Sequence, residues 1–199
     1  MRALRAGLNV EGAREFIRRV KQYRDIPIGL LMYYNLVTHY GTERFFADFH
    51  EAGVNSVLVA DLSVDDAEEV TGAARKAGMD TVFMVTPVTA EERMKRIVEL
   101  TTGFIYTVSV LGVTGSRDRL SEQVERLVDR LKSMTDVPVC VGFGISSGEQ
   151  AKAVATAGAD GVIIGSRIVK IIEENAGDMA AITREVGRFV SEVREALGG

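Results

Sequence analysis

Short runs of consecutive apolar residues alternate along the whole chain with longer stretches of helical period. Six of these runs are predicted to be strands, because each is brief and rich in branched or aromatic side chains. They are residues 26–35, 56–61, 81–86, 104–110, 137–142 and 161–165. Runs that are apolar throughout, without polar alternation, are typical of parallel strands covered on both faces.

Between the strands, apolar residues recur three and four positions apart, which predicts amphipathic helices. The stripe of the first helix consists of Ala13, Phe16, Ile17, Val20 and Tyr23. The segment before Met134 has Leu120, Val124, Leu127 and Leu131, and a last helix over about 179–197 has Ile182, Val186, Phe189, Val190 and Val193. Two helix starts are predicted from capping-box spacing, one at Thr89 with Glu92 and one at Ser146 with Glu149.

Repeated strand-helix units without a linker indicate right-handed crossovers and a parallel sheet. No Gly-x-Gly-x-x-Gly turn follows the first strand, so a barrel is favoured over a dinucleotide-binding open sheet. A (β/α)8 barrel has eight strands in about 250 residues. We therefore expect an α/β chain forming an incomplete TIM barrel, with about six βα units plus a C-terminal helix in a single domain over 1–199 that lacks the first two units.

Composition narrows the classes of partner. The 199 residues are 46% hydrophobic and 26% charged with a net charge of −4, and the charges are scattered, so neither nucleic acid nor a membrane is an expected partner. The single cysteine, Cys140, indicates a reducing compartment. Because no apolar stretch approaches the roughly 20 residues of a membrane span and no signal core is seen, a cytoplasmic location is expected.

Glycine-rich segments follow three of the late strands, at 112–115, 142–148 and Gly165-Ser166. Glycine lets the backbone approach an anion, and the helix that follows adds unpaired N–H groups. Each segment alone could simply make a tight turn. Together, in consecutive strand ends, they favour a phosphorylated small molecule as the ligand.

Several chemistries are disfavoured by what the strand ends lack. All six lysines fall in helical or flanking segments, so none is placed as a Schiff-base lysine. His39 and His50 have no partners at metal-ligand spacing and are interpreted as surface or structural. Cys140 lies within an apolar run without a nearby base, which favours a core role.

General acid/base chemistry remains, and the strand ends offer Asp61, Tyr33, Asn35, Tyr106 and Ser109. A carboxylate at the mouth of an apolar barrel should have a raised pKa, which suits proton transfer near neutrality. Asp61 is the best candidate among these residues. The alternative is a carboxylate that caps a helix or fixes a loop.

With these residues placed, the sequence resembles the tryptophan synthase α-chain family. The matching stretches are residues 26–37, 53–61, 112–115, 142–146 and 165–172. They cover nearly the whole chain, and the most specific part is Gly142-Phe-Gly-Ile-Ser146 followed by Gly165-Ser166.

The resemblance implies cleavage of indole-3-glycerol phosphate to indole and glyceraldehyde 3-phosphate by a retro-aldol step, without metal or organic cofactor, in complex with a β chain (α2β2). The phosphate would be held by Gly115, Gly144, Gly165 and Ser166. Tyr33, Tyr106 and Phe143 would line the cavity, with Asn35 as a further substrate contact. Thr114 would orient a catalytic aspartate, so the catalytic set within this sequence is Asp61, Tyr106 and Thr114.

Two departures from the family pattern stand out. The family's two principal catalytic carboxylates would precede Met1, so we expect residues 1–199 to bind weakly and not to turn over. Val110-Leu111 stands where bacterial members usually have Arg-Ser. The favoured explanation is a start at an internal methionine. The alternatives are a non-catalytic partner subunit, or another phosphosugar barrel such as an epimerase or a thiamin-phosphate-type synthase.

Overall fold

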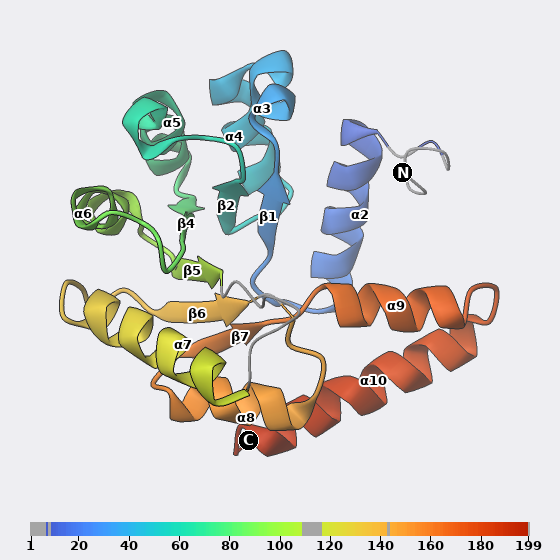
Figure 1. Cartoon of the computed structure of the whole chain (residues 1–199). Coiled ribbons are helices and arrows are strands. Elements are labelled where there is room, and N and C mark those ends of the chain that lie inside the picture. The colour runs from blue at the N-terminus through green and yellow to red at the C-terminus, as the bar shows by residue number, and fades with distance from the viewer. Residues whose placement is uncertain (1–6, 8, 109–116, 143, 199) are drawn as a thin grey trace. The chain divides into compact units, whose positions relative to one another are not determined.

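The computed structural model describes residues 7, 9–108, 117–142 and 144–198, with side chains described for all of these except 117–121. The chain forms two compact units (Figure 1). The first comprises Met1–Phe83 and Leu100–Gly103, and the second Met84–Glu99 and Phe104–Gly199.

The first unit is built around a parallel three-stranded sheet in the order β1-β2-β3. Its elements are α2 (Val10–Tyr23), β1 (Gly29–Met32), α3 (Tyr34–Tyr40), α4 (Thr42–Glu51), β2 (Ser56–Val59), the 3-10 helix η1 (Val64–Asp66), α5 (Glu68–Ala77) and β3 (Asp80–Thr81). Gly29 pairs with Ser56, and Ser56 pairs with Asp80, so the strands begin at the same edge.

The other sheet has four strands in the order β4-β5-β6-β7. Its elements are β4 (Phe83–Val85), α6 (Glu91–Leu100), β5 (Ile105–Val108), α7 (Arg117–Lys132), β6 (Val139–Gly142), α8 (Gly148–Thr156), β7 (Gly161–Ile163), α9 (Ser166–Glu174) and α10 (Met179–Ala196). Helices α7, α8 and α10 cover one face of this sheet (Figure 1).

Each predicted strand contains an observed one, but the observed strands are shorter. The run predicted as one strand over 81–86 is two strands, and they belong to different sheets. β3 pairs with β2, and the N–H of Val82 still donates to the carbonyl of Val57 at 2.9 Å, whereas β4 pairs with β5. The apolar run predicted burial correctly but did not show where the chain changes sheets.

Both predicted capping boxes were wrong in their details. Ser147, not Ser146, is the N-cap of α8, and its hydroxyl accepts from the N–H of Gln150 at 3.3 Å. Thr89 instead bonds back to Thr86, whose N–H it accepts at 3.0 Å, and α6 begins at Glu91. Adjacent hydroxyls offer the same local chemistry, so spacing alone placed the caps only to within a residue or two.

The predicted stripe of α2 is only partly buried. Ile17 is 6% exposed, but Phe16 is 64% and Tyr23 91% exposed. On a helix of 3.6 residues per turn, Phe16 and Tyr23 lie at one edge of the predicted apolar face and Ile17 at the other, so the core meets the face mainly on the Ile17 side. In α7 the stripe is confirmed at Val124, Leu127 and Leu131, whereas the side chain of Leu120 is outside the described part.

The core of the first unit is aromatic. Phe45 and Phe46 pack edge to face with ring centroids 5.5 Å apart, and Phe45 and Phe49 lie 4.4 Å apart. Tyr40 adds edge contacts to Phe45 and Phe49. All three phenylalanines come from α4, and they pack with Val57 and Val59 of β2 in one cluster. This cluster holds α4 on the sheet.

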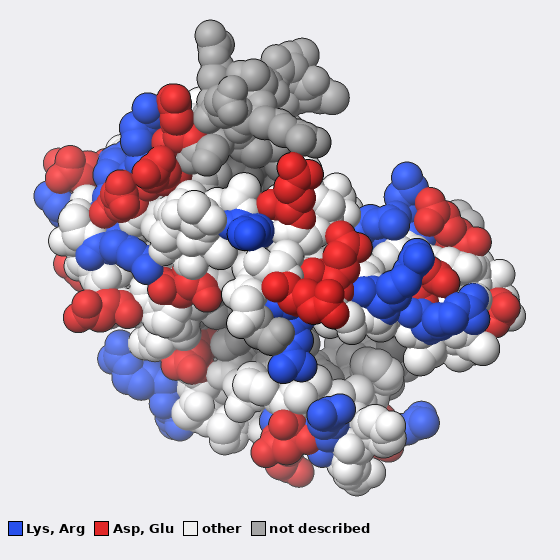
Figure 2. Space-filling model, turned by 90° about the horizontal axis from the view of Figure 1, so that it is seen from below, with Lys and Arg blue, Asp and Glu red and all other residues white. Residues whose placement is uncertain are grey.

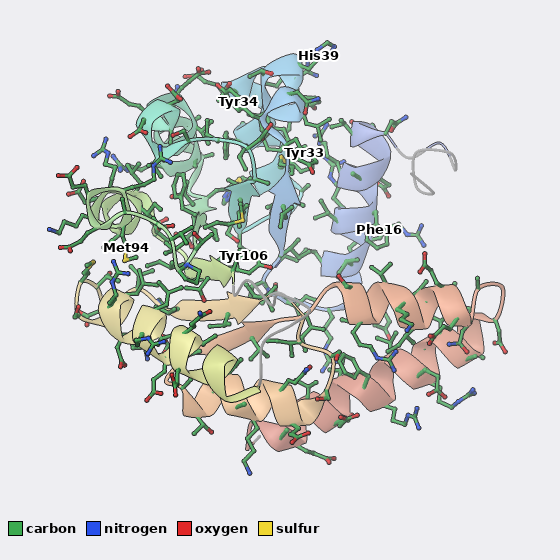
Figure 3. All side chains as sticks on the ribbon, viewed as in Figure 1. Phe16, Tyr33, Tyr34, His39, Met94 and Tyr106 are labelled. Atoms are coloured by element: carbon green, nitrogen blue, oxygen red, sulfur yellow. The ribbon has the colours of Figure 1, made fainter. Side chains whose placement is uncertain are left out.

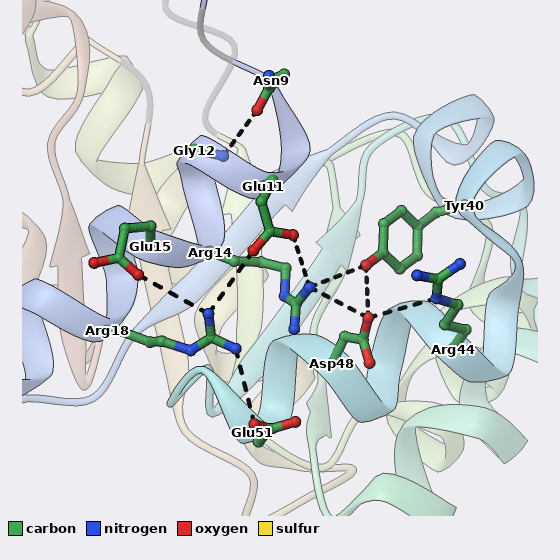
Figure 4. Close-up of polar contacts among 10 residues, drawn as sticks. All are labelled: Asn9, Glu11, Gly12, Arg14, Glu15, Arg18, Tyr40, Arg44, Asp48 and Glu51. Atoms are coloured by element: carbon green, nitrogen blue, oxygen red, sulfur yellow. Dashed lines mark hydrogen bonds and ion pairs between the residues drawn. The ribbon is translucent and has the colours of Figure 1, made fainter.

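A polar network lies beside this core and joins α2, α3 and α4 (Figure 4). The hydroxyl of Tyr40 donates to Asp48 Oδ2 at 2.6 Å. Arg14 Nη1 donates to Glu11 at 2.9 Å and to the Tyr40 oxygen at 3.3 Å, and it lies 3.4 Å from Asp48 Oδ2. Arg44 Nε is 3.6 Å from the same carboxylate oxygen. The hydrogen bond from Tyr40, followed by the two guanidinium groups, lowers the pKa of Asp48 against the opposing effect of burial.

Charges of both signs are interspersed on the face of the molecule shown in Figure 2. No helix in the described part of the chain is both long enough and apolar enough to cross a membrane.

Replacing Phe46 with alanine should lower the free energy of unfolding by about 3–5 kcal/mol, because a fully buried ring leaves a cavity. The measurement is urea denaturation followed by circular dichroism. Phe16→Ala is the matched control, since this exposed ring should change stability by only about 0.5 kcal/mol. Equal losses in the two variants would contradict the packing described here.

Asp48→Asn should make the free energy of unfolding depend less on pH in the acid range. A carboxylate whose pKa is lower in the folded state stabilises the fold at neutral pH, and this contribution disappears as the pH falls below about 4 and the group becomes protonated. The wild type should therefore lose stability in acid more steeply than the variant, measured by denaturation between neutral and acidic pH. Asp66→Asn, at an exposed position, should keep the wild-type slope.

Candidate functional site

The parallel register of β5, β6 and β7 sets the geometry of the site. Tyr106 pairs with Cys140, which pairs with Gly161. Two residues further along each strand, Val108 pairs with Gly142, which pairs with Ile163. Side chains alternate between the two faces of a sheet, so these six residues share one face. The opposite face is the buried one, where Ile105 and Val139 have no exposed surface.

On the shared face, glycines make room for large neighbours. A Cβ atom at Gly142 would lie 2.4 Å from Cε2 and 2.6 Å from the hydroxyl oxygen of Tyr106, far inside contact distance. A Cβ at Gly161 would lie 2.9 Å from the sulfur of Cys140. The Tyr106 ring, which projects from β5 (Figure 3), therefore lies directly against the backbone of the next strand.

Burial changes the chemistry of both larger residues. It raises the pKa of the Tyr106 phenol, so Tyr106 is a hydrogen-bond donor near neutrality rather than a base. Burial, and then the charge of Asp160, raise the pKa of the Cys140 thiol. A protonated thiol disfavours a nucleophile. Cys140 is half-buried and lies on the shared face rather than the buried one, so the core role expected for it is not shown.

Side chains occupy the N-terminus of α8, which follows β6. Glu192 of α10 accepts the N–H of Gly148 at 3.0 Å, and Ser147 accepts the N–H of Gln150. Gln150 Oε1 in turn accepts the N–H of Ser146 at 2.7 Å. Since these donors already have acceptors, and one acceptor is a carboxylate, this helix end offers little to an anion.

The N-terminus of α9, which follows the neighbouring strand β7, is different. Its N-cap is Gly165, which makes no side-chain capping bond, and its first turn contains no acidic residue. A Cβ added at Gly165 would meet nothing within 4 Å, so the space beside it is open. Open space, uncapped N–H groups and the positive end of the helix dipole together suit an anion. Gly144, in the adjoining turn, has a φ of 80°, a conformation that favours glycine.

The predicted residues of the first unit gather at the carboxyl ends of β1 and β2. Asp61 Oδ1 accepts the N–H of Tyr34, the first residue of α3, at 2.7 Å. Tyr33 is the N-cap residue of α3 and is 63% exposed, and Asn35 is an exposed residue in the first turn. Asp61 is itself exposed, and its contact with Tyr34 supports the loop-fixing alternative.

Three predicted site residues, Thr114, Gly115 and Phe143, lie outside the described residues, as do Ser109 and the Val110-Leu111 pair. The predicted residues that the structure does describe fall into two sets. Tyr33, Asn35 and Asp61 belong to the first unit. Tyr106, Gly144, Gly165 and Ser166 belong to the second.

All six lysines lie in helices, as predicted. His39 and His50 lie in α3 and α4. Within the described ranges, no group of three or more His, Cys, Asp or Glu side chains is placed to hold a metal ion.

Comparison with known proteins identifies the family. A family model described as the tryptophan synthase alpha chain matches residues 1–197. The tryptophan synthase alpha chain of Methanothermobacter thermautotrophicus is 42% identical over 198 residues, which are 100% of this chain and 73% of that protein. The corresponding chain of Geobacter sulfurreducens is 43% identical over 99% of this chain and 74% of its own length. The chain belongs to the tryptophan synthase α-chain family.

Solved structures lead to the same family. A chain of the tryptophan synthase α2β2 complex of Pyrococcus furiosus is 36% identical and superposes with a TM-score of 0.89, covering 98% of this chain and 77% of that one. The expected fold class, a parallel α/β fold of the tryptophan synthase α type, is thereby confirmed.

Sequence reasoning missed two residues that shape this family site. Ser147 was passed over in favour of Ser146, although both hydroxyls precede the helix. Glu192, which closes the N-terminus of α8, is 44 residues away from Gly148 along the chain. No local signal could have revealed the second contact, because it depends on how α10 packs against α8.

Gly142→Ala should cost about 1–3 kcal/mol of stability, the usual penalty for overpacking. The loss should largely vanish in a Tyr106→Ala background, because removing the ring removes the clash. A double-mutant cycle by chemical denaturation measures this coupling. Additive losses would show that the ring does not lie against the Gly142 backbone.

Proposed function

We propose that this chain acts in tryptophan biosynthesis as a tryptophan synthase α chain that binds indole-3-glycerol phosphate. The family's reaction is a retro-aldol cleavage of this substrate. The indole ring is protonated, a glycerol hydroxyl loses its proton, and the carbon-carbon bond between the ring and the glycerol chain breaks to give indole and glyceraldehyde 3-phosphate. Family membership over residues 1–197 supports this assignment.

The observation that carries the proposal is the contrast between two neighbouring helix ends. α8 has its terminal N–H groups bonded by Ser147 and Glu192, whereas α9 begins at Gly165 without a side-chain cap. A phosphate therefore binds at Gly165 and Ser166, where N–H donors, a positive dipole end and open space coincide. Gly144 and Gly115 complete the phosphate site in this proposal.

The remaining candidates surround the rest of the substrate. Tyr106 donates a hydrogen bond from its protonated phenol, which its raised pKa supports. Tyr33, Asn35 and Phe143 contact the substrate, and Thr114 orients a catalytic carboxylate. Asp61 is kept as a candidate for proton transfer, although its contact with Tyr34 also suits a structural role.

Catalysis also needs the family's two principal carboxylates, and the resemblance matches them to no position in residues 1–199. The proposal for residues 1–199 themselves concerns ligand binding. A β chain is the proposed protein partner, because the similar Pyrococcus furiosus structure is that of an α2β2 complex. A cytoplasmic location and a reaction without organic cofactor are proposed from the family.

Ser166→Asp should weaken the binding of indole-3-propanol phosphate, an uncleavable substrate analogue, by about tenfold or more. A new carboxylate at the α9 N-terminus repels the phosphate and competes for the same N–H groups. Titration calorimetry measures the affinity. Ser166→Ala should lose far less, because it removes one hydroxyl and adds no charge.

Thr183→Asp is the matched control, since it adds the same charge at an exposed position of α10. This variant should bind as the wild type does. Unchanged binding by Ser166→Asp would refute the phosphate position. If glycerol phosphate without an indole ring bound as tightly as the analogue, a different phosphosugar barrel enzyme would be favoured.

A further inference from the structure

A hollow of about 250 Å³ lies in the first unit at the amino end of β3. Its lining includes Arg75, Met79, Asp80 and Leu100, all of which belong to that unit. None of the residues proposed for phosphate or substrate lines it. The hollow is therefore separate from the proposed phosphate site.

The neutral polar groups of this pocket already have partners. The hydroxyl of Thr71 donates to the carbonyl of Ala67 at 2.9 Å, and that of Thr81 donates to the carbonyl of Leu100 at 2.6 Å. The hydroxyl of Thr102 accepts the N–H of Thr81 at 3.0 Å. These contacts make a rigid wall rather than a set of free groups.

Two described residues of the lining carry opposite charges and are not in an ion pair. In the part of the chain that the structure describes, neither Arg75 nor Asp80 forms an ion pair, with the other or with any third residue. A guanidinium is a specific partner for a carboxylate, and a carboxylate is a partner for an ammonium group. A ligand that is only an anion would be repelled by the carboxylate of Asp80, and one that is only a cation would be repelled by Arg75. A ligand carrying both charges satisfies both residues.

The backbone at this pocket is already satisfied. α5 ends here, at Gly78, which adopts a left-handed conformation with a φ of 77° and lines the pocket. The carbonyls of Ala74 and Arg75 accept the N–H of Gly78, and that of Leu100 accepts the hydroxyl of Thr81. The charges for a ligand therefore come from side chains, with an ammonium beside Asp80 and the carboxylate of the same ligand at Arg75.

The apolar part of the lining narrows the ligand further. It consists of Met79, which is 4% exposed, and Leu100. We propose that this pocket binds a free α-amino acid with an apolar side chain, its carboxylate on Arg75 and its ammonium on Asp80.

The test is a titration of the full chain with L-leucine at millimolar concentrations, followed by amide chemical shifts. Saturable shifts should centre on residues 78–81 and 102. Arg75→Gln and Asp80→Asn should each weaken binding by about tenfold, as expected for losing a charged hydrogen bond. Lys152→Gln and Glu195→Gln, exposed charges of the second unit, should leave it unchanged.

Analogues make the result independent of any effect on folding. N-acetyl-leucine lacks the ammonium and leucinamide lacks the carboxylate, so both should bind at least about tenfold more weakly than leucine. Equal binding of either analogue, shifts elsewhere in the chain, no saturable shift, or wild-type binding by both charge variants would each overturn the proposal.

Discussion

The contact between the Tyr106 ring and the backbone of Gly142 is the constraint on which the second sheet's functional end depends. A parallel sheet brings the carboxyl ends of its strands to one edge, but large side chains on the site face would otherwise crowd one another. Gly142 of β6 leaves room for the Tyr106 ring of β5, and Gly161 of β7 leaves room for the sulfur of Cys140 of β6. Gly142 is the last residue of β6, whereas Gly161 is the first residue of β7, so only the first of these glycines lies at a carboxyl end.

The turns after β6 and β7 lead into two helices that are not equivalent. α8 is tied to α10 through Glu192 and capped by Ser147, so its dipole end is already neutralised by protein groups. α9 carries no such cap and no acidic residue in its first turn. Within one sheet, then, one helix N-terminus is bonded by protein groups and its neighbour is left without a side-chain cap. A run of glycines in the sequence does not distinguish these two uses, whereas the hydrogen bonds do.

The sequence allowed the strands, their parallel arrangement and the glycine-rich ends to be predicted, because continuous apolar runs and turn residues are local signals. It did not reveal that 81–86 divides between two sheets, since Val82 bonds to Val57 through a contact that sequence pattern does not encode. It also overestimated the burial of Phe16 and Tyr23, because helical period predicts a face but not how much of that face the core covers. The contact from Glu192 depends on tertiary packing and was missed for the same reason. The cap at Ser147 is local and was missed because two adjacent hydroxyls offer the same chemistry.

Asp61 shows why position at a strand end does not by itself make a catalytic carboxylate. Proton transfer near neutrality needs a carboxyl group whose charged form is destabilised by burial. Asp61 is exposed, and one of its oxygens accepts the N–H that starts α3 at 2.7 Å, which holds Tyr33 and Asn35 at the ends of β1 and β2. This contact fixes the start of α3 and the side chains beside it. Asp61 is therefore better suited to position neighbouring side chains than to move a proton.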